Sequence, residues 1–162
     1  MPRRFPLPQC LTGKCSQEEY THWLYGKAKA HVKRDRKRGN RVCSTDTYRC
    51  SIHAAVCDGG DNDAFTGEPL RWDLIRKYDN THSKAGRRGY KKQFALLPTV
   101  DHLDEGLGEP KFAICGWRTN DCKGDLTVEE LASFCEIFLG RMGRGAKPVT
   151  NSLGPVASVR ES

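Results

Sequence analysis

Residues 97–126 read LPTVDHLDEGLGEPKFAICGWRTNDCKGDL, and the fold is decided in this stretch. An apolar run ends at Asp101 and His102, and a turn rich in acids and glycine follows it. A second apolar run over residues 112–117 leads into a polar segment that contains Asn120. Two short apolar runs joined by a turn are typical of a β-hairpin, and the polar segment is typical of the start of a helix. The stretch therefore predicts a hairpin with a carboxylate and an imidazole at the end of its first strand, followed by a helix that carries an amide.

This order of residues resembles the HNH endonucleases, which are also called His-Me finger or ββα-metal nucleases. The resemblance covers the stretch itself and, more loosely, the approach from Asp63, because AFTGEPL at residues 64–70 is similar to the turn that often precedes such a finger. Pro110 and Lys111 stand where the family frequently has an asparagine. The resemblance implies an α+β fold in which a ββα-metal finger, a two-stranded hairpin plus a helix, is flanked by helices. The residues that carry it are Asp101, His102, Asn120, Lys123 and Asp125.

The resemblance also implies roles for three of these residues. His102 would be the general base, and Asp101 and Asn120 would hold one divalent cation, so that His102 and Asn120 form the catalytic set. Oxygen ligands suit Mg²⁺ or Mn²⁺, and an imidazole with a pKa near 6.5 can remove a proton from water at cellular pH. Adjacent residues of a strand point to opposite faces, so Asp101 and His102 can serve one phosphate only where the strand ends or bulges. The implied activity is metal-dependent hydrolysis of phosphodiester bonds in DNA.

Basic residues are concentrated in two blocks of the chain, which carries a net charge of +7. The first block lies between residues 27 and 41 with Asp35 as its single acid, and the second lies between residues 76 and 92, opposed by Asp79 alone. Each Lys or Arg that reaches a phosphate releases condensed counterions, so two such blocks near a candidate phosphodiesterase site indicate DNA as the partner. The alternative for either block is a solvated basic face that only aids solubility. The residues expected to contact nucleic acid are Lys33, Arg34, Arg36, Lys37, Arg38, Arg87, Arg88, Lys91, Lys92, Arg118 and Lys123.

The chain of 162 residues has the length of one domain. We expect an irregular, proline-rich segment over residues 1–15, a basic helix over 16–41, an HNH nuclease core over 42–139 and a flexible tail over 140–162. No apolar run reaches the roughly 20 residues of a membrane helix. The first residues have no apolar region typical of a signal peptide. These features predict a cytoplasmic protein that does not enter a membrane.

Two capping boxes predict helix starts, one from Ser16 with Glu19 and one from Thr127 with Glu130. The first helix has an aromatic face in its first half and is almost wholly basic in its second half. His31, in the second half, has no partner at a metal-ligand spacing and is expected at the surface. The second helix has an apolar stripe, which predicts that it packs in the core. The stripe consists of Leu131, Phe134, Cys135 and Phe138.

Eight cysteines are present, and no two of them form a C-x-x-C pair. In a cytosol the thiols are expected to be reduced. The spacings do not favour a structural Zn²⁺ site, and Cys115 and Cys135 are expected to be small buried residues because they lie inside apolar runs.

A second function remains open at this stage. The chain would then be a nucleic-acid-binding protein without catalysis, with or without a cysteine-bound zinc that shapes the basic regions. The sequence indicates neither the recognition site nor whether one or both DNA strands are cut. A symmetric double cut would imply a homodimer, but nothing in the sequence identifies a dimer surface.

Overall fold

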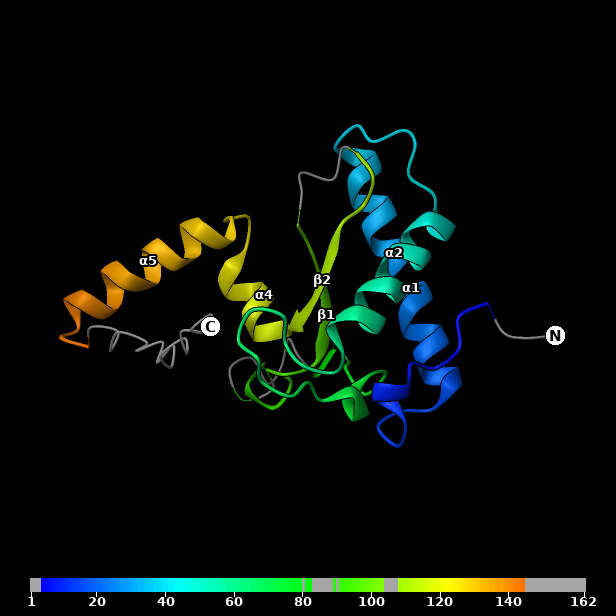
Figure 1. The fold of residues 1–162 in the computed structure, drawn as a ribbon, viewed down its shortest axis with the longest axis horizontal. Helices are drawn as coiled ribbons and strands as arrows, with labels where there is room; N and C mark the ends of the chain where they lie inside the picture. The colour runs from blue at the N-terminus through cyan, green and yellow to red at the C-terminus, as the bar shows by residue number, and fades with distance from the viewer. Residues whose placement is uncertain (1–3, 80, 83–88, 90, 104–107, 145–162) are drawn as a thin grey trace, which may run out of the picture. The chain divides into compact units, whose positions relative to one another are not determined.

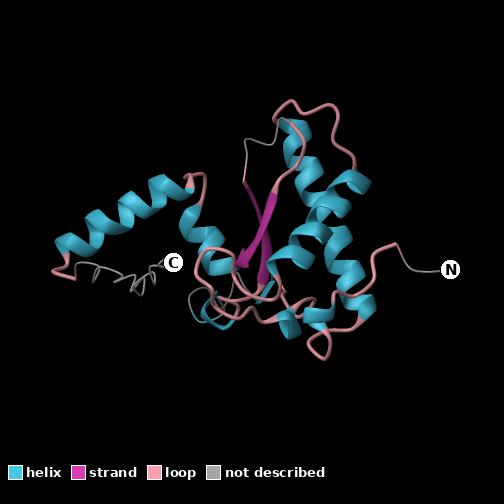
Figure 2. Ribbon diagram, in the orientation of Figure 1, coloured by secondary structure: helices cyan, strands magenta, loops and turns pink. Residues whose placement is uncertain are grey.

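A computed structural model shows a mixture of helices and one two-stranded antiparallel sheet, which confirms the α+β class (Figures 1 and 2). It describes residues 4–79, 81–82, 89, 91–103 and 108–144. Contacts divide the chain into two compact units, Met1–Asp125 and Leu126–Ser162. In chain order the elements are the 3₁₀ helix η1 (Gln9–Leu11), α1 (Gln17–Lys37), α2 (Thr45–Gly59), the 3₁₀ helix η2 (Trp72–Leu74), β1 (Pro98–His102), β2 (Phe112–Gly116), α4 (Trp117–Lys123) and α5 (Val128–Arg141).

Helix α1 begins at the capping box predicted from the sequence. The Ser16 hydroxyl accepts a hydrogen bond from the Glu19 amide, and the Glu19 carboxylate accepts one from the Ser16 amide. These bonds satisfy two donors that a helix start leaves without partners. The helix ends near Gly39, whose φ of 106° suits a residue without a side chain. Its buried face runs along almost its whole length and consists of Tyr20, Trp23, Leu24, Ala28, His31, Val32 and Asp35.

The hairpin lies between two groups of helices in the first unit. Helices α1 and α2 pack on each other, α2 packs on β2, and α4 packs on both strands (Figure 1). The alternation of side chains along a strand explains this arrangement. Val100, Phe112 and Ile114 project from one face into the main core, which α1 and α2 also build. Asp101 and its strand partner Ala113 project from the other face, where α4 packs.

Helix α1 is also bonded directly to β1. The indole nitrogen of Trp23 donates to the carbonyl of Pro98 over 3.2 Å, and Lys27 Nζ donates to the Thr99 hydroxyl over 2.9 Å. Burial lowers the pKa of Lys27 to about 8. Lys27 is therefore a structural member of the first basic block rather than a free surface cation.

Asp63 ties the turn at residues 64–70 to the hairpin and to α4. Its carboxylate accepts hydrogen bonds from the amides of Phe65 and Thr66 over 2.8 and 3.0 Å. It also accepts from the Gly116 amide over 2.7 Å and from the Thr119 hydroxyl over 2.6 Å. One buried side chain thus fixes the point where β2 passes into α4.

Helix α5, in the second unit, forms where its capping box predicts it. Thr127 and Glu130 exchange the expected hydrogen bonds. The prediction that its apolar stripe packs in the core is wrong, because α5 has no buried residue. Cys135 is exposed with the stripe, whereas Cys115 is buried as predicted. No described helix is both long and apolar enough to cross a membrane, and the predicted tail lies outside the described residues from 145 onward.

Candidate functional site

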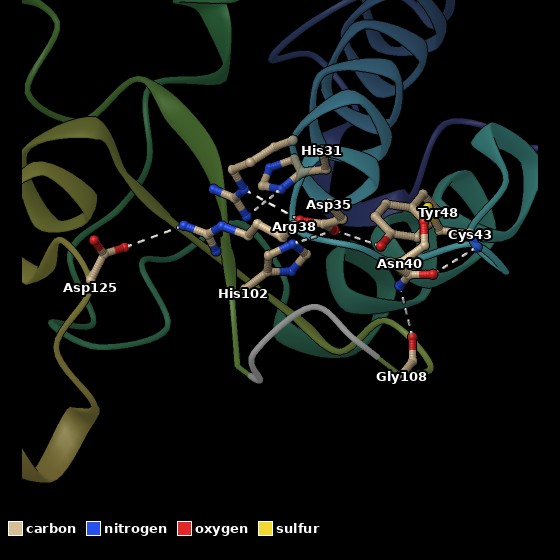
Figure 3. A network of polar contacts seen from close by, with 10 residues as sticks. His31, Asp35, Arg38, Asn40, Cys43, Tyr48, His102, Gly108 and Asp125 are labelled. Atoms are coloured by element: carbon tan, nitrogen blue, oxygen red, sulfur yellow. Dashed lines mark hydrogen bonds and ion pairs between the residues drawn. The ribbon is translucent and has the colours of Figure 1, made fainter.

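His102, at the end of β1, belongs to a buried polar network with residues of α1 and α2 (Figure 3). Its Nε2 lies 2.8 Å from Asp35 Oδ2, and the Tyr48 hydroxyl donates to the same oxygen over 2.5 Å. The imidazole stacks on the ring of its strand partner Phe112 at 4.7 Å, and the ring of His31 meets its edge at 4.8 Å. His102 is only 8% exposed and Asp35 is fully buried. The network therefore fixes both the orientation of the imidazole and the nitrogen that faces Asp35.

The charge states in this network follow from its contacts. Burial alone would raise the pKa of Asp35, but the hydrogen bonds from Tyr48 and His102 outweigh it and lower that pKa. Burial and the hydrogen bond to Asp35 raise the pKa of Tyr48. Burial, reinforced by Arg34, lowers the pKa of His31 to about 3. Asp35 is thus an anion and His31 is neutral at pH 7. Because a carboxylate can only accept, His102 Nε2 donates to it.

The expectation that His31 lies at the surface is wrong. His31 is 8% exposed, and its Nδ1 accepts a hydrogen bond from Arg34 over 3.0 Å. The spacing of the buried face of α1 explains the error. Tyr20, Leu24, His31 and Asp35 follow the helical repeat, so the core face continues into the basic half of the helix.

Asp101 faces α4 on the opposite side of β1. Lys123 Nζ lies 3.0 Å from Asp101 Oδ2, and both side chains are nearly buried. Asn120 is half-buried on α4, about one turn before Lys123. Hence the structure brings Asp101 to the helix that carries Asn120. It also places the Lys123 ammonium against the expected metal ligand.

The structure does not place His102 on the face that Asp101 shares with α4. Strand pairing is regular from Pro98 to His102, and the Leu103 amide continues it by donating to the Lys111 carbonyl over 2.9 Å. The strand does end at His102, but it has no bulge between Pro98 and His102 that would turn both side chains to one face. Asp101 and His102 therefore flank the end of β1 from opposite sides.

Asp101 and Asn120 are the two residues that would have to bind a divalent cation. Asp101 Oδ2 accepts no hydrogen bond from a described residue, although the Lys123 ammonium lies at ion-pair distance. A buried carboxylate oxygen with unfilled lone pairs is a hard oxygen ligand of the kind that Mg²⁺ or Mn²⁺ takes, as is an amide oxygen such as that of Asn120 on the helix that carries Lys123. The residues thus fit such an ion in chemistry. The ammonium of Lys123 now supplies the positive charge there. Among the described residues, no three His, Cys, Asp or Glu side chains are grouped to bind a metal.

The basic end of α1 lies beside the His102 network, because Asp35 is part of both. Arg34 contacts His31 and Asp35, and Arg38 forms an ion pair with Asp125 at 3.7 Å (Figure 3). All five expected nucleic-acid contacts on this segment are exposed, and Lys33 and Lys37 have no ion pair with another described residue. The five are Lys33, Arg34, Arg36, Lys37 and Arg38.

In the second basic block, Lys77 and Lys91 pair with acids, whereas Arg76 is exposed. Lys91 pairs with Asp121 at 2.9 Å, and Arg118 pairs with Glu68. Lys92 is exposed. Arg87 and Arg88 lie outside the described residues. Lys123 is buried against Asp101 and is not a surface contact.

Sequence reasoning missed Asp35, Tyr48 and Asp63 as parts of the site. Asp35 had a signal, because it is the only acid in the first basic block and falls on the helical repeat of the buried face. The sequence marks Asp63 only as the start of the loosely matching approach, and Tyr48 had no signal, since the contacts of both depend on how distant segments pack. Comparisons of the chain with family models, with curated proteins and with solved structures found no match.

Proposed function

We propose that this protein is an HNH-type, metal-dependent endonuclease that hydrolyses phosphodiester bonds in DNA. The observation that carries the proposal is the end of β1. There, an imidazole held by a buried carboxylate lies beside the exposed cations of α1, and on the opposite side of the strand a second carboxylate faces α4. Perturbed ionisable groups beside a basic surface are typical of functional sites.

His102 acts as the general base in this proposal. Its Nε2 donates to Asp35, so Nδ1 would be the nitrogen that takes the proton from the attacking water, and it must first be uncovered because it is buried in this structure. Asp35 orients the ring and stabilises the imidazolium that forms, as an anion beside a base does in other hydrolases. Tyr48 holds the carboxylate in place through its hydroxyl.

The remaining groups bind the substrate and its charge. Arg34 and Arg38, with the exposed lysines of α1, attract the phosphate backbone to the end of β1. Asp101 and Asn120 would hold a divalent cation, which would supply charge neutralisation for the phosphate oxygens and the departing alkoxide. Lys123 would then have to move away from Asp101, because its ammonium lies against that carboxylate.

The proposal predicts nicking of supercoiled plasmid DNA by the purified protein with Mg²⁺ or Mn²⁺, and its loss with EDTA. Replacing His102 with alanine should lower the rate by roughly 10²- to 10⁴-fold, the usual contribution of a general base, while DNA binding is retained. Agarose gels measure the rate, and thermal unfolding verifies the fold of the variant.

His53→Ala is the matched control. His53 is also partly buried and hydrogen-bonded, to Tyr20 over 2.7 Å, but it belongs to α2 and its ring packs against Phe5 and Tyr20. Its loss should leave the cleavage rate within about threefold of the wild type. If His102→Ala and His53→Ala lower the cleavage rate equally, or if His102→Ala cleaves DNA as fast as the wild type, His102 is not the general base.

A second function is favoured by one observation, the ion pair of Lys123 with Asp101. An ammonium that already neutralises the carboxylate can replace the divalent cation permanently. The finger would then be a nucleic-acid-binding module without catalysis. This function predicts salt-sensitive DNA binding with no nicking across divalent metals and pH.

Binding of Mn²⁺ separates the two functions without relying on activity. Titration followed by electron paramagnetic resonance should show one bound ion per chain, lost in Asp101→Asn, if the site takes a metal. No specific binding, with DNA binding intact, would favour the module in which Lys123 holds Asp101. Elemental analysis for zinc tests whether any cysteines bind a structural ion in either case.

A further inference from the structure

Helix α5 presents a stripe of large apolar side chains that the other described residues of its unit leave exposed and that the proposed function does not use. Phe134 is 59% exposed, Phe138 is 56% exposed and Met142 is 60% exposed. With Leu131 and Cys135, these side chains repeat at intervals of three and four residues, so they form one continuous face of the helix. Such a face on a soluble chain marks an interaction surface.

The charges beside this stripe indicate what covers it. Glu129 and Glu130 lie in the first turn of α5, and Arg141 lies in its last turn. Glu130 and Arg141 are eleven positions apart, which is about three turns. They therefore lie on the same flank of the stripe at opposite ends. A second α5 running antiparallel would bring the acidic end of each helix to the basic end of the other.

We propose that α5 pairs with α5 of a second copy of this chain in an antiparallel, two-fold symmetric dimer. The stripes form the apolar centre, and Glu130 of one chain pairs with Arg141 of the other. The midpoint of positions 130 and 141 falls between Cys135 and Glu136, so the two Cys135 thiols lie near the symmetry axis. This inference does not depend on the proposed function.

The expected interface is small. A helix of 14 residues is about 21 Å long, and a pair of such helices buries less than about 1,200 Å², the low end of specific interfaces. The dimer should therefore dissociate on dilution. Sedimentation velocity of the full chain over a hundredfold range of concentration should show monomer and dimer in exchange.

Substitution in the stripe tests the apolar part. Phe134→Glu should weaken the dimer at least tenfold. Ser133→Glu is the matched control, because it adds the same charge on the opposite face of α5 and should leave the dissociation constant within about twofold. Thermal unfolding of both variants shows whether the first unit remains folded. A protein that is monomeric at every concentration, or a dimer that tolerates Phe134→Glu, would overturn the proposal.

Charge exchange tests the orientation. Glu130→Arg alone and Arg141→Glu alone should each weaken the dimer by about three- to tenfold, because each places like charges opposite one another twice. The double variant with both changes should recover the wild-type constant, since every opposing pair is then restored. In a parallel pair the double variant would dimerise no more tightly than the single variants, and this result would overturn the antiparallel arrangement.

Cross-linking tests the position of the axis. In a background with Cys50, Cys57 and Cys122 changed to serine, mild oxidation should yield a covalent dimer through Cys135. The covalent dimer should disappear with Cys135→Ser. A dimer by sedimentation that never cross-links through Cys135 would place the axis elsewhere and overturn the register proposed here.

Discussion

Asp35 connects a basic surface with a buried network. Its neighbours Arg34 and Arg36 are exposed, while its own carboxylate is fully buried and accepts hydrogen bonds from Tyr48 and His102. A buried carboxylate is stable only when its oxygens are hydrogen-bonded or paired. Because α1 cannot rotate without breaking these bonds, the cations on its last turns are held in place beside the end of β1.

Asp63 is a second buried carboxylate, and it allows a prediction about stability. It is 2% exposed and accepts four hydrogen bonds. Burial would raise the pKa of Asp63, but the bonds from Thr119, Gly116, Phe65 and Thr66 outweigh it and lower that pKa. Asp63→Asn should lower the free energy of unfolding by roughly 2–3 kcal/mol at pH 7, since hydrogen bonds to a charged acceptor are lost. Urea unfolding measures the change.

The difference in the free energy of unfolding between wild type and Asp63→Asn should change with pH in a definite direction. A lowered pKa in the folded state gives stabilisation that is fully present above the unfolded value of about 4 and is lost as the pH falls through the folded value. The gap between wild type and Asp63→Asn should therefore narrow below pH 4. Asp58→Asn, an exposed acid at the end of α2, should show no gap at any pH. A gap for Asp63→Asn that does not change with pH would contradict the assigned charge state.

At the scale of elements, local signals in the sequence predicted where helices and strands form. Both capping boxes are present where Ser16 and Thr127 predicted them, and the hairpin forms where the apolar runs predicted it. These features depend on hydrogen bonds between residues close in the chain. They could therefore be found without knowledge of the packing.

The surroundings of the site residues could not be predicted in the same way. The ion pair of Asp101 with Lys123 and the bond of His102 to Asp35 join residues of different elements. They depend on which helix covers which face of the hairpin. For α5, the helical period was visible in the sequence, but whether a partner covers the stripe depends on tertiary and quaternary packing. A period identifies an apolar face without identifying what the face contacts.

The junction between β2 and α4 leads to a prediction about stability. A Cβ added at Gly116 would lie 2.9 Å from the Ala95 carbonyl oxygen and 3.3 Å from Asp63 Oδ2. Gly116→Ala must therefore push backbone apart or displace the Asp63 carboxylate. We expect a loss of roughly 1–3 kcal/mol in the free energy of unfolding, as for other overpacked sites. Chemical unfolding measures it.

Gly26→Ala serves as the comparison for Gly116→Ala. Gly26 lies within α1, is exposed, and has open space where a Cβ would go. Alanine there should stabilise the protein by about 0.5–1 kcal/mol, because glycine is unfavourable inside a helix. If both substitutions lower the free energy of unfolding alike, the close contacts at Gly116 are not the cause of the loss in Gly116→Ala.

At the scale of the whole molecule, the net charge of +7 favours association with a polyanion, but the described cations differ in what they can offer. Lys91, Arg118 and Lys123 are ion-paired with acids of the same chain. Cations already paired release few counterions when a phosphate approaches. In the proposed function, the exposed lysines at the end of α1 should therefore contribute most to DNA binding.

This expectation can be measured through the salt dependence of binding. Lys33→Gln with Lys37→Gln should reduce the slope of log K against log salt by about two, close to one for each lost phosphate contact. Lys14→Gln with Lys77→Gln removes the same charge from cations that pair with Asp61 and Asp73, so the slope should change by much less. Fluorescence anisotropy with a labelled DNA duplex measures both slopes. The salt concentration runs from about 50 to about 300 mM, roughly the range in which phosphate contacts change the affinity. Equal changes in the two double variants would mean that the DNA responds to net charge alone. The end of α1 would then lose its assignment as the contact surface, whether or not the protein cuts its substrate.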